Sequence, residues 1–361
     1  MTETLVEVIG GVDTHADTHT AAAVDTTGRL LGHQQFPTDP DGYRQLLDWL
    51  ASFGRVRQVG VEGTGSYGVG LYRHLHAQGI SVIEVDRPSR KTRRRRGKSD
   101  SIDAETAARA VLAGTATTVP KTRTGIVETL RVITTTRATA VKARTAAKNA
   151  LTAIARTAPE PLRSQLSGLG TDRLIAAAAD LKPGFDMTEP CTATALALRR
   201  LARRCHNLAA EIREADLDLE LILRELAPDL LARPGVGPAT AAQLLITAGD
   251  NPQRLRAEAA FAMLCGAAPL PASSGRTDRH RLNRSGDRQA NKALHTIALS
   301  RSRHHPETRA YIDRRTRQGL SDRDIRRCLK RYIARELFTH LQNALRRNTL
   351  QTPPPAQLST T

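Results

Sequence analysis

The order of short apolar segments in residues 6–85 constrains the fold of this chain more than any other feature. Residues 6–25 predict two short strands around a polar turn, and residues 29–36 predict a third, because apolar and β-branched runs are interrupted by Gly, Asp and Thr. Three segments then alternate between helical and strand patterns: a helix at 42–53, a strand at 58–62 and a helix at 69–78. A continuous apolar strand at 80–85 completes the order βββαβαβ, which is typical of an α/β domain with buried parallel strands.

An alanine-rich segment at residues 98–110 follows this pattern and favours a helix. Asp100 and Asp103 are three positions apart, so both carboxylates should project from one helical face, with Cβ atoms about 5–6 Å apart. Such a pair can form half of a metal site. The same two acids can also serve as an N-cap and a first-turn residue of an ordinary helix.

Two further carboxylates lie at predicted strand ends. Asp13 ends the first strand and Glu62 ends the fourth, where side chains from neighbouring strands can converge on a ligand. Each acid alone could be a turn or solvated end residue, but the four together favour a site for Mg²⁺ or Mn²⁺, which prefer oxygen ligands. His15 and His19 lie on the predicted turn and are expected to be solvated rather than to act as ligands.

A dense basic run precedes the alanine-rich helix. The formal net charge of the whole chain is +18, and aromatic residues make up only 3% of it. These features favour backbone contact with a polyanion over base stacking. Acidic residues beside a phosphate-attracting run therefore indicate phosphoryl transfer on nucleic acid. The candidate phosphate contacts in this run are Arg87, Arg90, Lys91, Arg93, Arg94, Arg95, Arg96 and Lys98.

The four cysteines are widely spaced and lack metal-ligand spacing, which predicts reduced thiols and a cytoplasmic location. No apolar run approaches the roughly 20 residues that a membrane span needs. The acidic start of the sequence also lacks the basic region of a signal peptide.

The composition shifts at about residue 125 to Ala, Arg, Leu, Thr and Glu. Two long helices, at 127–154 and 196–226, are predicted to form a coiled-coil-like arm, interrupted between 158 and 190. The preferred interpretation of this arm is a spacer that docks a partner protomer. Residues 230–249 then contain a Pro-Gly-Val-Gly-Pro turn that has the form of a helix-hairpin-helix turn, although the same turn can simply join two helices.

Ser273 and Ser274 stand in a glycine-containing loop beside four arginines. A serine there is either a phosphate contact or a nucleophile, and the residues alone favour the contact, because a hydroxyl needs a base or a metal to become reactive. Two basic amphipathic helices are predicted in residues 306–341, and the chain from Asn348 onward is expected to be disordered. The arginines of the loop are Arg276, Arg279, Arg281 and Arg284.

Several motifs resemble the insertion sequence 110 family of transposases. GVDTH, GVEGTGSYG, VDRPSR and GKSDSIDAETAARA resemble its N-terminal domain, and the only departure is the run of four arginines before Lys-Ser-Asp. The resemblance implies a RuvC-like domain with an RNase H fold, whose acidic tetrad would be Asp13, Glu62, Asp100 and Asp103. GVGPATAAQLL and CGAAPLPASSGRTDRHRLNRSGDRQANKAL resemble the C-terminal transposase domain, which implies Ser274 as the nucleophile, with Ser273 as the alternative.

The expected fold class is therefore α/β plus all-α. A RuvC-like domain is expected at 1–124, a helical arm at 125–228, a transposase domain at 229–347 and a disordered tail at 348–361. The resemblance implies a recombinase that cuts and rejoins donor and target DNA with a structured guide RNA encoded by its element, acting as a dimer or tetramer. A junction-hydrolysing nuclease that uses water is the alternative enzyme, and a non-catalytic nucleic-acid scaffold is a third interpretation.

Overall fold

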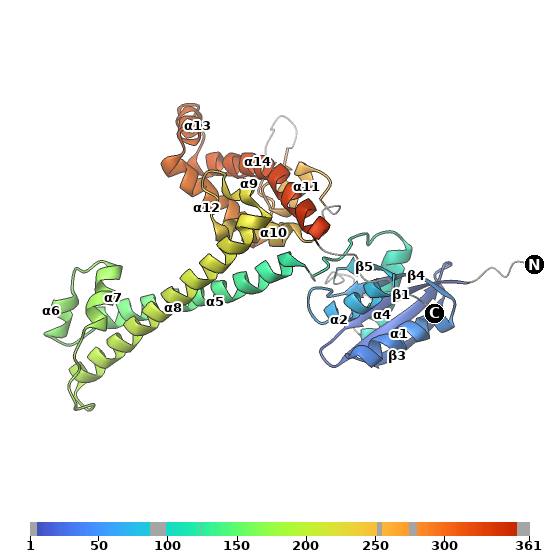
Figure 1. Cartoon of the computed structure of the whole chain (residues 1–361), viewed down its shortest axis with the longest axis horizontal. Coiled ribbons are helices and arrows are strands. Elements are labelled where there is room, and N and C mark those ends of the chain that lie inside the picture. The colour runs from blue at the N-terminus through green and yellow to red at the C-terminus, as the bar shows by residue number, and fades with distance from the viewer. Residues whose placement is uncertain (1–5, 87–98, 124, 251–254, 274–279, 352–361) are drawn as a thin grey trace, which may run out of the picture. The chain divides into compact units, whose positions relative to one another are not determined.

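The computed structural model describes residues 6–86, 99–123, 125–250, 255–273 and 280–351 (Figure 1). They fall into two compact units that divide between Thr124 and Gly125. The predicted basic contacts from Arg87 to Lys98, and Ser274, Arg276 and Arg279, lie outside the described residues. In the described part of the chain no helix is both long enough and apolar enough to cross a membrane.

The first unit is built on a five-stranded mixed sheet with the order β3-β2-β1-β4-β5. The first three strands form an antiparallel meander, whereas β4 pairs parallel to β1 and β5 pairs parallel to β4. This arrangement confirms the predicted strand order along the chain and the parallel pairing of the apolar strand. The strands are β1 (Glu7–Thr14), β2 (Thr18–Asp25), β3 (Leu30–Pro37), β4 (Arg55–Glu62) and β5 (Ser81–Val85).

Helices cover both faces of this sheet. α1 (Pro40–Ser52) and α2 (Val69–Ala77) share a core with Val8, whereas α4 (Asp100–Leu112) shares another with Ile9. Val8 and Ile9 are consecutive in β1, so their side chains point to opposite faces. α1 and α2 therefore lie on one side of the sheet and α4 on the other.

α4 lies unusually close to the sheet because glycines face it. A Cβ on Gly11 of β1 would stand 2.2 Å from the backbone oxygen of Ala104 and 2.3 Å from the backbone nitrogen of Ala108. A Cβ on Gly60 of β4 would stand 2.9 Å from the backbone oxygen of Ala107. These distances are too short for any side chain, so the backbone of α4 rests directly on β1 and β4.

The second unit is mainly helical. Figure 1 shows its two longest helices, α5 (Ile126–Arg156) and α8 (Pro190–Leu226), side by side, with α6 (Leu162–Leu166) and α7 (Thr171–Ala179) at one end. The predicted long helices are thus confirmed, and the predicted interruption contains two short helices. At the other end are α9 (Pro228–Leu231), α10 (Pro238–Ala248), α11 (Glu258–Leu264), β6 (Leu270–Pro271), β7 (His280–Arg281), α12 (Arg288–His304), α13 (Pro306–Arg317) and α14 (Asp322–Gln351).

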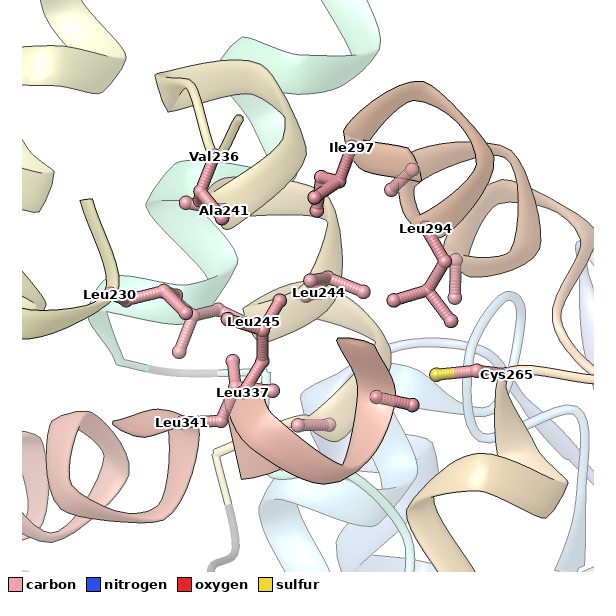
Figure 2. Packing of buried hydrophobic residues seen from close by; sticks show 14 of the residues in the cluster. Leu230, Val236, Ala241, Leu244, Leu245, Cys265, Leu294, Ile297, Leu337 and Leu341 are labelled. Atoms are coloured by element: carbon pink, nitrogen blue, oxygen red, sulfur yellow. The ribbon is translucent and has the colours of Figure 1, made fainter. Parts of the chain in front are cut away.

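One hydrophobic core holds this end together. Figure 2 shows Leu230, Leu244, Leu245, Ile297 and Leu337 of this core, which come from α9, α10, α12 and α14. The same core contains buried residues from the adjoining ends of α5 and α8, namely Val127, Leu130, Leu219 and Leu223. The base of the arm is therefore part of the core around which the C-terminal helices pack.

The expectation of disorder from Asn348 is wrong for its first residues. α14 continues to Gln351. Prolines occupy positions 353, 354 and 355, and a residue that precedes proline is disfavoured in helical conformation. The prolines, rather than Asn348, therefore mark where the helical pattern of the sequence ends.

Candidate functional site in the N-terminal unit

Two of the predicted acids end neighbouring strands of the sheet. Asp13 is the penultimate residue of β1 and Glu62 is the last residue of β4. Because Val12 pairs with Val61 in parallel register, Asp13 and Glu62 are the next residues along their strands. Thr14 ties the two strand ends together by donating its hydroxyl to the backbone oxygen of Glu62 at 2.8 Å. Both acids are buried, each with 7% of its surface exposed.

The other two predicted acids are in the first turn of α4. Ser99 caps this helix, its hydroxyl accepting a hydrogen bond from the amide of Ile102 at 3.3 Å. The unpaired amides at a helix N-terminus favour nearby carboxylates. Asp103 is 7% exposed, and it immediately precedes Ala104, whose backbone lies over Gly11 of β1. Because α4 packs so closely on β1, Asp103 lies toward the end of the strand that holds Asp13.

His15 joins the acids of the strand and the helix. Its Nε2 lies 3.2 Å from Asp13 Oδ2 and 3.4 Å from Asp100 Oδ1. One ligand atom from each of these three residues lies within 4.8 Å of the other two. His15 is exposed, as expected, with 49% of its side chain accessible, and it also contacts two of the predicted acids. The sequence contained one signal for the contact with Asp13: His15 follows it by two positions, and residues two apart near a strand end can project from the same face.

His19 departs from its expected place on a solvated turn. It belongs to β2, is fully buried, and stacks on Tyr43 with ring centroids 5.7 Å apart. Burial lowers the pKa of His19, which favours the neutral ring. This histidine is a core residue and not part of the acidic cluster.

The electrostatics of Asp13 show that the carboxylates act on one another. Burial raises the pKa of Asp13; the neighbouring His15 lowers it, and the negative charges of Asp100 and Asp103 raise it again. Like charges that are close and partly removed from water disfavour joint ionisation unless a cation lies between them. Carboxylate oxygens with one imidazole form a donor set that fits a divalent cation. The structure thus brings ligand atoms of Asp13, His15 and Asp100 together, whereas Asp103 acts on Asp13 through its charge and Glu62 lies on the adjoining strand end.

The region around the predicted serine loop is described at both ends. Leu270 pairs with Arg281 and Pro271 with His280, so β6 and β7 form a short antiparallel pair. Arg281 and Arg284 are exposed, as phosphate contacts would need to be. Ser273 also lies within the described residues.

The glycine turn before α10 is built mainly for packing. Gly235 approaches α12, where an added Cβ would stand 3.1 Å from the backbone oxygen of Ile297. The amide of Gly237 donates to the hydroxyl of Thr240 at 3.0 Å. One amide that could have met a phosphate is therefore already paired, which favours the simpler interpretation of a turn that joins two helices.

Comparison with known proteins agrees with this geometry. A family model described as a transposase and named for the DEDD acids of IS110 elements matches residues 10–158, which include all four acids. A second, described as "Transposase IS116/IS110/IS902 family", matches residues 228–313. A Streptomyces coelicolor protein named "Insertion element IS110 uncharacterized 43.6 kDa protein" is 35% identical over 132 residues, which are 36% of this chain and 32% of that protein. Since two separate parts of the chain match transposases of the same elements in the expected order, the chain belongs to the IS110 family of transposases.

Proposed function

We propose that this protein is a DNA recombinase that moves an insertion element, and that the acidic cluster is its metal site. The observation that carries this proposal is the meeting of Asp13, His15 and Asp100 at one sheet edge, with Asp103 acting on Asp13. Family membership supports DNA as the substrate. The strand order and the meander of the first three strands support an RNase H-like, RuvC-type fold for residues 1–124.

In this proposal Asp13, Glu62, Asp100 and Asp103 hold Mg²⁺ or Mn²⁺. When bound, the ion supplies positive charge for the phosphoryl oxygens on which charge develops during reaction. An imidazole proton on His15 Nε2 can be donated to Asp13 or Asp100, which would hold that carboxylate in a fixed orientation.

The strand-breaking step is assigned to the serine loop. The Oγ of Ser274 attacks a DNA phosphorus, the bond from phosphorus to the departing strand breaks, and that strand leaves as a free hydroxyl. A serine–DNA phosphodiester remains, and a hydroxyl of another strand reverses the attack to rejoin DNA. The exposed Arg281 and Arg284, with Arg276 and Arg279, provide positive charge for the flanking phosphates.

A nuclease that uses water is the second candidate, because the acids alone suffice for metal-dependent hydrolysis. The two candidates differ in covalency. Attack by serine leaves protein joined to a DNA phosphate, whereas hydrolysis leaves only free ends.

We further propose that a structured RNA guides the protein and that it works as a dimer or tetramer. The net charge of +18 supports a large polyanionic partner. We expect full-length protein purified from cells carrying its element to retain one structured RNA in defined stoichiometry. Sequencing of the bound RNA, followed by a donor–target joining assay with Mg²⁺ and with EDTA, tests the guide and the metal requirement. Joining that is independent of this RNA contradicts the guide, and joining in EDTA contradicts the metal site.

The basic run provides a test of phosphate binding. Replacing Arg93, Arg94, Arg95 and Arg96 with alanine should weaken DNA binding and flatten its salt dependence, because each lost phosphate contact reduces the slope of log K against log salt by about 0.7–0.9. Titrations of a labelled duplex at several salt concentrations measure this slope. Alanines at Arg309, Arg317, Arg323 and Arg326 remove equal charge from exposed positions of α13 and α14 and serve as the control. An unchanged slope in the first variant contradicts the assignment.

A further inference from the structure

A pocket in the second unit is lined by residues 266–269, by residues 280–283 that include β7, and by α14. Its volume is about 390 Å³. One wall is formed by the small and apolar residues Ala267, Ala268, Pro269 and Leu282. The opposite wall is α14, which contributes Lys330 and Tyr332. Ligand pockets commonly range from about 300 to 1,000 Å³, so this one suits a single small unit rather than a duplex.

Lys330 places a buried positive charge in this pocket. The residue is 9% exposed, and its Nζ donates to the side-chain oxygen of Asn291 at 2.9 Å. Among the residues that the structure describes, no carboxylate lies within 4.0 Å of this ammonium. The two ion pairs nearby involve arginines instead. Asp324 is paired with Arg327, and Glu258 is paired with Arg331.

An ammonium in this setting is costly without an anion. Burial lowers the pKa of Lys330, and the positive charge of Arg327 lowers it further. Asn291 offers only a neutral partner, and its own amide nitrogen is engaged with the backbone oxygens of Cys265 and Gly266. A phosphate oxygen would compensate the buried charge, as charge-assisted hydrogen bonds are stronger than neutral ones.

Tyr332 supplies a different kind of surface beside Lys330. Its side chain lines the pocket, and the residue is 55% exposed. The ring is supported by Tyr311, edge to face, with centroids 5.6 Å apart. Arg314 lies over the Tyr311 ring at 5.4 Å, so Tyr311 is itself held in place. An exposed ring with a fixed support can stack on a nucleobase.

We propose that this pocket binds one nucleotide of a nucleic-acid strand, with its phosphate at Lys330 and its base on Tyr332. Side chains two positions apart on a helix do not face each other, but Lys330 and Tyr332 both line this pocket, so the phosphate and the base would meet different parts of its wall. This inference rests on the proposed function for its choice of DNA, because β7 follows the loop that carries the proposed nucleophile.

A short fluorescent oligonucleotide tests the pocket without requiring cleavage. The probe is a four-nucleotide single-stranded DNA that contains 2-aminopurine, whose emission falls when the base stacks, and an RNA of the same sequence is the comparison. Full-length Lys330→Gln and Tyr332→Leu should each bind the DNA probe about tenfold more weakly, because the first variant loses the charged contact to phosphate and the second loses the stacking surface. Tyr332→Leu should also lose the quenching.

Two matched variants make the result specific. Tyr332→Phe keeps the ring and should bind within about twofold of the original protein, since stacking does not need the hydroxyl. Lys292→Gln removes an exposed ammonium from α12 and should behave likewise. Equal affinity in all four variants contradicts the proposal that the pocket binds a nucleotide. Tighter binding of the RNA probe contradicts the assignment of the pocket to DNA.

Stability separates a binding role from a structural one. Removing an uncompensated buried charge should leave the unfolding temperature of Lys330→Gln unchanged or higher, whereas a clear fall means that Lys330 serves the fold and overturns its role here. Asp103→Asn should bind the probe normally. If the original protein recombines DNA and neither Lys330→Gln nor Tyr332→Leu changes probe binding, the pocket proposal is wrong and the proposed function stands.

Discussion

Replacing Ser274 with alanine is expected to abolish DNA joining while nucleic-acid binding persists. The proposed reaction passes through a bond between Ser274 Oγ and a DNA phosphorus, and alanine has no atom that can form it. Removing a serine nucleophile from a well-studied protease lowers its rate by about 10⁶-fold, so the loss here should exceed about a thousandfold. Reactions with end-labelled DNA, stopped by denaturant, should contain a protein–DNA adduct in the original protein and none in Ser274→Ala.

Ser273→Ala is the matched control, because it removes the neighbouring hydroxyl and should keep the adduct. If the adduct instead persists in Ser274→Ala and disappears in Ser273→Ala, the nucleophile is Ser273. If DNA is cut but neither the original protein nor either variant forms an adduct, the nuclease that uses water is the better description.

Asp103→Asn is expected to reduce strand cleavage by more than about a hundredfold. Losing even an outer partner of a metal ligand commonly costs about 10- to 100-fold in affinity or activity, and Asp103 is proposed as a ligand itself. DNA affinity should change little, because the substitution removes no cation that contacts phosphate. Cleavage across a Mg²⁺ and Mn²⁺ titration, together with DNA binding, measures both effects.

Glu105→Gln supplies the control from the same helix. Glu105 pairs with Arg109 at 2.7 Å on the surface of α4, and exposed pairs of this kind contribute about 0–1 kcal/mol. This variant should cut DNA normally. Full cleavage by Asp103→Asn would remove Asp103 from the metal site, and equal losses in both variants would point to a general effect on α4.

The sequence predicted the first unit well because its pattern is local. Alternating and continuous apolar runs mark strands whether or not their partners are known, so the order βββαβαβ was accessible. The convergence of Asp13 and Glu62 followed from one rule about strand ends. Pairing register and the height of α4 above the sheet depend on contacts between distant segments, and no single segment encodes them.

The two histidines show where local patterns fail. His15 meets Asp100, which is 85 positions away, and only the packing of α4 on β1 brings them together. His19 was assigned to a turn, but β2 begins at Thr18, so the turn is shorter than predicted. The pocket beside Lys330 was equally inaccessible, since β6 and β7 are two residues each and carry no periodicity.

The close packing of α4 on the sheet means that two glycines help to position the proposed metal ligands. Gly11 and Gly60 set the height at which the first turn of α4 carries Asp100 and Asp103 over the strand that carries Asp13. A single methyl group at position 11 would wedge the helix away and separate the acids of the strand from those of the helix. The spacing of the proposed metal site therefore depends on contact between the backbone of α4 and the backbone of the sheet. One added carbon atom at position 11 would be enough to change that spacing.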